Sequence, residues 1–191
     1  MSKANETLYK DLVTNFSPSD HSSILEIGQG NGLHIPWIMS TGTNLSYTAI
    51  DLSKEMVKAA EGLNPEFIRG GKVRIVQGNC RKMKFESESF EYVLGVNTLY
   101  FWSPIEQFLE EIKRVLKTDG KLILGYRTRS SMMELPFSRY GFDLYEAKDM
   151  EAILEKSGFN SISSRHFQEE IKGPDGRKLR LGAVFTLASC S

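Results

Sequence analysis

The sequence predicts an α/β fold in which helices cover both faces of a mostly parallel sheet. Strand-like and helix-like segments alternate along most of the 191 residues, an order typical of parallel sheets. A turn with three glycines, LEIGQGNG (residues 25–32), includes the end of the first strand-like run, where such sheets bind ligands. GPDG (173–176) is expected to turn the chain between the last two strand-like runs, which makes these two strands antiparallel.

The first predicted element is an N-terminal helix, because apolar residues recur at helical spacing over residues 8–16. SPSDHS breaks this pattern, and the apolar run Ile24–Ile27 is predicted to be a buried strand. The glycine turn then leads into a helix at Leu33–Met39, in which Pro36 is tolerated only near the first turn.

The next strand is predicted at Leu45–Ile50, and it ends at Asp51. Ser53 is a suitable N-cap for a helix that runs to residue 63, because its hydroxyl can accept a hydrogen bond from a backbone N–H of the first turn. Two further apolar runs, Val73–Val76 and Phe90–Leu94, are predicted to be the third and fourth strands.

In the second half, Ser103-Pro104-Ile105-Glu106 joins a capping-box pattern to a proline at the first helical position. The helix that starts there extends to Leu116, and Asp119-Gly120 is expected to turn the chain into a strand at Lys121–Tyr126. Another helix is expected to end at Gly158. The last two strands follow it, near Phe159–Phe167 and Leu179–Leu187.

Composition limits the functional classes. Lys and Arg together number 24, as do Asp and Glu, so no whole-molecule field favours nucleic acid or an anionic membrane. Cys80 and Cys190 are too few for a metal cluster and suit a reducing cytosol. No apolar run approaches the ~20 residues that span a bilayer. We therefore expect one cytoplasmic domain over residues 1–191, without a metal, nucleic acid or membrane insertion; the oligomeric state stays open.

The glycine turn is a candidate ligand site. Gly28, Gly30 and Gly32 permit unusual backbone angles and close approach, and free N–H groups at the following helix start favour an anionic group. The spacing E-x-G-x-G-x-G differs from the dinucleotide pattern G-x-G-x-x-G/A, since position 33 is leucine. Asp51 lies 51 − 32 = 19 residues after the last glycine, where an acid can bind ribose hydroxyls. The alternative is a tight turn without a ligand, with Asp51 as a turn residue.

Five motifs together resemble the class I S-adenosylmethionine-dependent methyltransferases. They are ILEIGQGNG, YTAIDLSKEMV, VRIVQGNC, SFEYVLGVNTLYFW and LKTDGKLILG, in the order and spacing of that family, and the match covers about Ile24 to Phe159. The chain looks most like the small-molecule type, the ubiquinone and menaquinone C-methyltransferases and their relatives in the methyltransferase type 11 group. The resemblance implies a Rossmann-like seven-stranded sheet with an antiparallel last strand. It also implies S-adenosylmethionine as the cofactor and S-adenosylhomocysteine as its product.

The resemblance assigns cofactor-binding roles near the first two strands. Glu26 and the glycine turn would face the methionine end of the cofactor. Asp51 would hold the ribose hydroxyls, and Leu52 and Met56 would flank the adenine, although Met56 also fits a buried position on a helix stripe.

Further cofactor roles follow from the third and fourth strands. Asn79 and Cys80 would lie beside the adenine edge, and the backbone of Val96 and Asn97 would border the reacting methyl group. The family usually has an acid where Asn79 stands and prefers Asp where Glu91 stands. An asparagine oxygen can still accept a hydrogen bond from the adenine amine. Asn79 as a turn residue and Asn97 as a self-bonded loop residue are the alternatives.

The acceptor side is expected in the loops beyond the strands. The stretch Asn97–Trp102 offers aromatic side chains for an apolar small molecule, and Arg127 could pair with a carboxylate or phosphate. Residues 1–20 are expected to cap the pocket, and residues 127–146 to form a loop on the substrate side. The candidate acceptor-side residues are Tyr9, Tyr100, Trp102, Arg127 and Tyr140.

The sequence offers no convincing catalytic base. His34 is the best of the three histidines, because it lies near the glycine turn, but its pattern also fits a helix surface. The catalytic residues and the acceptor atom, whether O, N or C, therefore stay unassigned. The function predicted is methyl transfer to a small molecule. The alternatives are a nicotinamide-dependent oxidoreductase, a methyltransferase acting on protein or RNA, and a non-catalytic S-adenosylmethionine-binding module.

Overall fold

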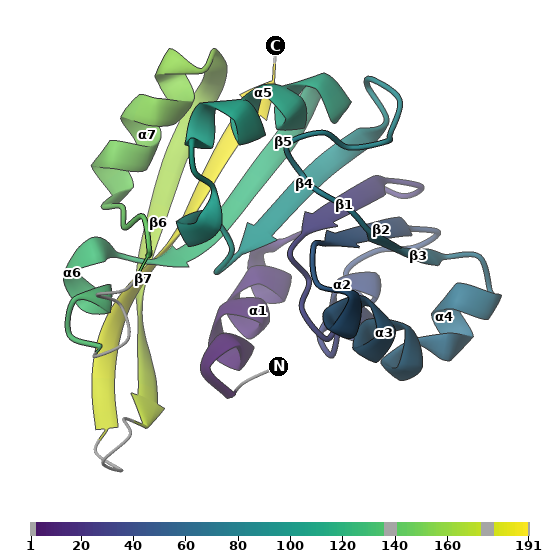
Figure 1. Cartoon of the computed structure of the whole chain (residues 1–191), viewed down its shortest axis with the longest axis horizontal. Helices are drawn as coiled ribbons and strands as arrows, with labels where there is room; N and C mark the ends of the chain where they lie inside the picture. Colours follow the sequence, from purple (N-terminus) through teal and green to yellow (C-terminus); the bar gives the residue numbers. More distant parts are fainter. Residues whose placement is uncertain (1–2, 136–140, 173–177, 191) are drawn as a thin grey trace.

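Seven strands form one sheet in the order β3-β2-β1-β4-β5-β7-β6 (Figure 1). The computed structural model describes residues 3–135, 141–172 and 178–190. The strands are β1 (Ser23–Ile27), β2 (Ser46–Asp51), β3 (Val73–Gln77), β4 (Phe90–Val96), β5 (Leu116–Arg127), β6 (Phe159–Lys172) and β7 (Lys178–Cys190). β7 is antiparallel to both β5 and β6, and the other pairings are parallel. The predicted mostly parallel sheet with an antiparallel last strand is confirmed.

Helices cover both faces of the sheet, as predicted. They are α1 (Lys3–Asn15), α2 (Ile35–Met39), α3 (Lys54–Leu63), α4 (Pro65–Arg69), the 3-10 turn η1 (Leu99–Phe101), α5 (Ile105–Val115), α6 (Arg129–Met132) and α7 (Ala147–Lys156). Figure 1 shows α1 and α2 on one face and α5 and α7 on the other. No helix in the described part of the chain is long and apolar enough to cross a membrane.

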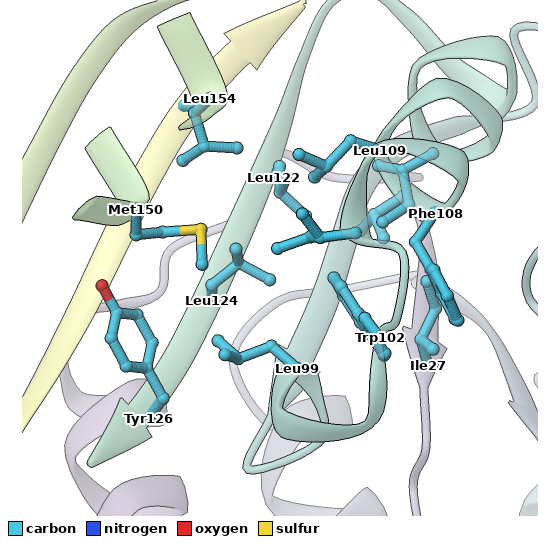
Figure 2. Packing of buried hydrophobic residues seen from close by; sticks show 14 of the residues in the cluster. Ile27, Leu99, Trp102, Phe108, Leu109, Leu122, Leu124, Tyr126, Met150 and Leu154 are labelled. Atoms are coloured by element: carbon cyan, nitrogen blue, oxygen red, sulfur yellow. The ribbon is translucent and has the colours of Figure 1, made fainter. Parts of the chain in front are cut away.

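Each face of the sheet buries its own apolar core. Leu109 of α5 and Met150 and Leu154 of α7 pack against the β5 side chains Leu122 and Leu124 (Figure 2). The opposite core contains the apolar stripe of α1 and the buried residues of α2. Residues of β1 alternate between these cores, since successive side chains of a strand point to opposite faces. Glu26 therefore lies on the α1 side and Ile27 on the α5 side.

Short sequence signals such as N-cap residues and glycines predict most helix and strand boundaries to within a few residues of their observed positions. Ser53 is the N-cap of α3, and its Oγ accepts a hydrogen bond from the backbone N–H of Met56 (3.3 Å), as predicted. α7 ends just before Gly158, whose φ of 79° is the left-handed conformation that favours glycine. The predicted GPDG turn lies outside the described residues.

Three local predictions are wrong or incomplete. α5 begins at Ile105, because Pro104 is an extended N-cap residue (ψ 137°) without a side-chain cap. The predicted turn at Asp119-Gly120 is an irregularity inside β5: Leu116 pairs with Phe90, but Lys121 pairs with Tyr92. Asp119 has a φ of 61°, so the turn signal produces a bulge instead of a loop. The short helix α4 was not predicted.

Candidate functional site

A cavity of about 440 Å³ lies at the carboxyl ends of β1, β2, β3 and β4, and such a volume is typical of a ligand site. Its wall comes from the segments that follow these strands and from Phe108 of α5. The predicted site residues that line it are Gly28, Asp51, Leu52, Asn79, Cys80, Asn97 and Trp102. The topology thus brings together Gly28 and Trp102, which are 102 − 28 = 74 residues apart in the sequence.

The glycine turn makes room for the protein's own side chains as much as for a ligand. Gly28, Gly30 and Gly32 all have positive φ angles, of 74°, 56° and 65°. A Cβ at Gly28 would lie 2.5 Å from Oγ1 of Thr98, and one at Gly32 would lie 2.9 Å from Cβ of Ala60. At Gly30 no atom of the described residues, apart from its two chain neighbours, lies within 4 Å of that position. Gly30 therefore faces open space, into which a ligand can fit without displacing the protein.

The expected anion site at the following helix is not supported. α2 has only five residues, and its first backbone N–H groups are already bonded. Ile35 N–H donates to the carbonyl of Gly32 (3.2 Å), and Trp37 N–H donates to that of His34 (2.9 Å). Because the turn tightens directly into the helix, those groups are not available to an anion.

Asp51 joins the end of β2 to the glycine turn. Its Oδ2 accepts a hydrogen bond from Gly30 N–H (3.1 Å), and its Oδ1 accepts one from Ser53 N–H (2.9 Å). Each carboxylate oxygen has more than one acceptor direction, so both can also receive ribose hydroxyls. Asp51 is thus a turn residue, and its place in the cavity wall is compatible with the predicted ribose contact.

The residues predicted around the adenine differ in exposure. Leu52 lines the cavity with 72% of its surface exposed, and Met56 is also exposed, which excludes the alternative of a buried Met56. Asn79 Oδ1 already accepts a hydrogen bond from Arg81 N–H (2.9 Å), which leaves one acceptor direction for an adenine amine. Burial raises the pKa of the Cys80 thiol to about 11, so it is neutral at physiological pH.

Glu26 does not line the cavity; it lies under α1 in a cluster of four polar side chains. Its Oε1 accepts a hydrogen bond from the hydroxyl of Tyr9 (2.5 Å), and its Oε2 is bonded to Nε2 of His34 (2.9 Å) and to the hydroxyl of Tyr47. All four side chains are buried, and the rings of Tyr9 and His34 stack with centroids 3.6 Å apart. We call these residues the Glu26 cluster. His34 is therefore not the helix-surface residue that its pattern indicated.

Within the Glu26 cluster, burial and neighbouring side chains shift the pKa of Glu26 and of both tyrosines. Burial acts to raise the pKa of Glu26, but His34 and the two tyrosine hydroxyls outweigh it, so the pKa is lowered. Burial and the Glu26 charge raise the pKa of Tyr9 and Tyr47 well above 10. Both phenols thus stay protonated and donate to a carboxylate, which stays ionised without contact with water.

Asn97 connects the end of β4 to α1. Its side-chain amide donates to Oδ1 of Asn5 (2.9 Å), and its own Oδ1 accepts from the hydroxyl of Tyr100 (3.0 Å). The alternative of a self-bonded loop residue does not hold for this side chain. Val96 is buried in the core that contains α1, so only its backbone can border a cofactor. Residues 3–15 form the predicted N-terminal helix, α1, but none of them lines the cavity, so the capping role stays a prediction.

The predicted acceptor-side residues are mostly buried and occupied. The Tyr100 hydroxyl accepts a hydrogen bond from Arg127 N–H (2.6 Å). The Arg127 guanidinium forms a buried ion pair with Glu169 of β6, so it faces that carboxylate and not the cavity. Trp102 reaches the cavity wall as part of a stack with Phe108, whose ring centroid is 5.5 Å away (Figure 2). Tyr140 lies outside the described residues.

Phe101 is a cavity residue that the sequence analysis did not single out. It lines the cavity with 62% of its surface exposed, and its ring centroid lies 5.1 Å from that of Phe142. Thr98 and Arg81 also line the cavity. Within residues 100–102, Phe101 is exposed while its two aromatic neighbours are buried. The sequence does not reveal this difference in exposure, because the segment is a 3-10 turn without a periodic pattern.

Several groups around the glycine turn fit a polar ligand such as S-adenosylmethionine. Gln29 is buried (3% exposed), yet neither its Oε1 nor its Nε2 has a hydrogen-bond partner among the residues that the structure describes. An unsatisfied buried amide costs roughly 1–3 kcal/mol, so a partner supplied by a ligand would be stabilising. Together with the open space at Gly30 and the acceptor capacity of Asp51, this supports a polar ligand at this edge.

Comparison with known proteins adds independent findings. Residues 25–124 match the model of a methyltransferase domain. An uncharacterized protein of Methanocaldococcus jannaschii is 31% identical over 172 residues, covering 84% of this chain and 76% of its own. A phthiotriol/phenolphthiotriol dimycocerosates methyltransferase of Mycobacterium ulcerans is 30% identical over 148 residues (78% of this chain, 48% of its own).

Two further similarities extend this result. The sterol 4-C-methyltransferase strm-1 of Caenorhabditis elegans is 28% identical over 127 residues, covering 65% of this chain and 36% of its own. This chain therefore spans half or less of the two named enzymes. The crystal structure of an S-adenosylmethionine-dependent methyltransferase from Methanosarcina mazei aligns with a TM-score of 0.71 over 94% of this chain and 96% of its own, at 19% identity.

Proposed function

The chain belongs to the class I S-adenosylmethionine-dependent methyltransferases, and from this premise we propose that its methyl acceptor is an apolar small molecule. The observation that carries the proposal is the exposed ring of Phe101 at the cavity, backed by Phe142. The sterol substrate named for the worm relative is of the same apolar class.

When bound, S-adenosylmethionine supplies an activated methyl group. The chain would hold it with the carboxylate of Asp51 at the ribose hydroxyls and with Leu52 and Asn79 at the adenine. Gly30 leaves space for its methionine end, and Gly28 lines the cavity next to it. Holding the reactants close and aligned can supply ~7–11 kcal/mol of the barrier, so positioning is the main task of this wall.

Among the described residues, the cavity wall contains no evident general base. Its titratable side chains are Asp51, Cys80 and Arg81; Asp51 would be engaged by ribose, and Cys80 is protonated at neutral pH. His34 is buried with Glu26 and away from the cavity. We therefore expect an acceptor atom that needs no proton removed by the enzyme, such as a nucleophilic carbon or a group already ionised at working pH.

The first test is calorimetric titration with S-adenosylmethionine, S-adenosylhomocysteine and NADH. Binding of both sulfur ligands without binding of NADH is expected. A labelled-methyl assay would then compare sterols and other apolar acceptors with polar amines and with protein and RNA. Transfer to the apolar class, reduced at least about tenfold in Phe101→Ser, would support the proposal, since a buried aromatic contact contributes a few kcal/mol. Transfer only to protein or RNA would contradict it, and tight cofactor binding without any transfer would indicate a non-catalytic module.

A further inference from the structure

Trp102 carries a buried hydrogen-bond donor for which the described part of the chain supplies no acceptor. Its side chain is 1% exposed, and its indole Nε1–H has no hydrogen-bond partner among the described residues. An indole nitrogen can only donate, and a buried tryptophan N–H usually finds an acceptor. The same side chain forms part of the cavity wall. An acceptor atom of a ligand in the cavity would therefore satisfy a donor that these residues leave unpaired.

The surroundings of the Trp102 ring do not require an N–H group. The ring belongs to the apolar core that also contains Ile27, Leu99 and Phe108 (Figure 2). Such a core is stabilised by apolar contact area, to which a polar N–H adds nothing, and an unpaired buried donor is unfavourable. Packing therefore explains the large ring at this position but not its nitrogen.

A series of contacts along the cavity wall connects Trp102 with the residue expected at the adenine edge. Trp102 stacks on Phe108 of α5, with ring centroids 5.5 Å apart and an interplanar angle of 6°. The guanidinium carbon of Arg81 lies 5.8 Å from the centroid of Phe108, and the backbone N–H of Arg81 donates to Oδ1 of Asn79 (2.9 Å). All four residues line the same cavity. The unpaired donor thus belongs to the part of the wall that includes Asn79.

We propose that the indole N–H of Trp102 donates a hydrogen bond to a ring nitrogen of the cofactor's adenine. Adenine combines a donor amine with acceptor ring nitrogens, so Asn79 Oδ1 and Trp102 Nε1–H offer the complementary pair of groups. Because no hydrogen bond holds the indole, a small turn of the ring toward the ligand breaks none. Trp102 is then a cofactor-specificity residue instead of the acceptor-side residue that the sequence predicts. The inference rests on the proposed placement of adenine at Asn79.

The first test observes the indole N–H directly by ¹H–¹⁵N NMR of the ¹⁵N-labelled full chain. The chain has two tryptophans, so Trp37→Phe assigns the two indole signals. Saturation with S-adenosylhomocysteine is expected to move the Trp102 proton signal downfield, as a new hydrogen bond does. 5′-Methylthioadenosine, which has the adenine but not the amino-acid end, should move it in the same direction. An unmoved Trp102 signal at saturation with both ligands overturns the proposal.

The second test removes the donor and each possible acceptor in turn. Calorimetry would compare S-adenosylhomocysteine with its deaza analogues, in which a C–H group replaces one ring nitrogen of the adenine. At least one analogue should bind the wild type about fivefold or more weakly, the usual consequence of losing one hydrogen bond. In Trp102→Phe this difference should shrink to less than about twofold, because the donor is absent. Since both ligands are compared in the same variant, a general loss of affinity cancels.

Trp37→Phe is the matched control, because it makes the same substitution in α2, outside the cavity wall. Its penalties for the deaza analogues should equal those of the wild type. Penalties that are equal in the wild type and in Trp102→Phe overturn the proposed contact.

The outcomes separate this contact from the proposed function. Binding of S-adenosylhomocysteine without any dependence on Trp102 overturns the contact and leaves the cofactor site and the apolar acceptor in place. Methyl transfer only to polar acceptors contradicts the proposed function, whereas a Trp102-dependent deaza penalty still supports the contact. Absence of S-adenosylhomocysteine binding in the wild type overturns the placement of adenine and this contact with it.

Discussion

The Glu26 cluster and the cavity lie on opposite sides of the same strand end, and they differ in how far the protein satisfies its own polar groups. Under α1, Glu26 has three hydrogen-bond partners and no exposure to solvent. Across the sheet, Asp51 is half-buried and faces a cavity, and within the described ranges its carboxylate bonds only to backbone N–H groups. A buried charge with complete partners contributes to the integrity of the fold, whereas a partly satisfied one can still bind a ligand.

The comparison bears on the two acidic residues to which family resemblance gives cofactor roles. Both are expected to contact the cofactor, but only Asp51 is placed to do so without rearrangement. Contact with Glu26 would require the methionine end to replace the hydroxyl of Tyr9, which belongs to α1. We therefore expect substitutions of Glu26 to act mainly on stability and substitutions of Asp51 to act mainly on affinity.

The largest effect is expected for Glu26→Ala. Removing the buried carboxylate leaves Tyr9, Tyr47 and His34 buried without this partner, and each unsatisfied group costs roughly 1–3 kcal/mol, so we expect a loss of about 3–5 kcal/mol. Denaturant unfolding followed by circular dichroism would measure the loss. Glu91→Ala is the control on the neighbouring strand: its carboxylate is half-exposed, pairs with Lys117 and accepts a hydrogen bond from Ser23 N–H (2.7 Å), so the expected loss is about 1–2 kcal/mol. A loss below that of Glu91→Ala would contradict the structural role of the Glu26 cluster.

Tyr9→Phe removes one hydroxyl from the same cluster and keeps the stacked ring. We expect a loss of about 1–3 kcal/mol in unfolding free energy, the usual consequence of leaving a buried acceptor without one donor. Affinity for S-adenosylmethionine should change less than about twofold if the cofactor does not reach Glu26. A larger change in affinity, measured by calorimetry, would show that the two regions are not separate.

Asp51→Ala is the corresponding change on the cavity side. It should weaken S-adenosylmethionine binding at least about tenfold, or 1.4 kcal/mol, because the ribose hydroxyls lose a charged acceptor. Ser53→Ala is the control: it removes the N-cap of α3 at about 1 kcal/mol of stability and leaves the carboxylate in place. Unchanged affinity for S-adenosylmethionine in a folded Asp51→Ala protein would contradict the proposed contact between Asp51 and the ribose.

How well the sequence predicts the Glu26 cluster and the cavity depends on how far apart in the sequence the interacting residues lie. The strands, the Ser53 cap and the glycine turn follow from patterns within a few residues, so they were predicted well. The partners of Glu26 come from α1, β2 and the loop before α2, and no spacing rule links Tyr9, Tyr47 and His34. The exposure of Phe101 between buried Tyr100 and Trp102 depends on η1, a turn too short for a periodic signal.

Long-range contacts also explain why the structure brings some predicted cofactor-binding residues to the cavity and leaves others on the opposite face of the sheet. Family motifs specify which residue stands at a strand end, but the face that its side chain takes follows from strand alternation and from what covers that face. Here α1 covers Glu26 and Val96, while the cavity wall includes Leu52, Asn79 and Cys80. The cofactor contact of Glu26 therefore stays a prediction that depends on movement of α1, whereas the predicted contact of Val96 needs only its backbone.

The smallest expected effect is a pH dependence confined to the Glu26 cluster. The pKa of Glu26 is lowered in the folded protein, so between its folded pKa and the ordinary value of 4.5 the unfolded chain binds the additional proton. Stability from this group is complete above the ordinary value and is lost as the pH falls through the folded pKa. Glu26→Gln cannot titrate and should show a shallower slope, by at most about 1.4 kcal/mol per pH unit. Urea unfolding of both proteins across the acidic range would measure the difference. Equal slopes would mean that Glu26 is not ionised under α1, and the contrast with Asp51 would then reduce to a difference in burial alone.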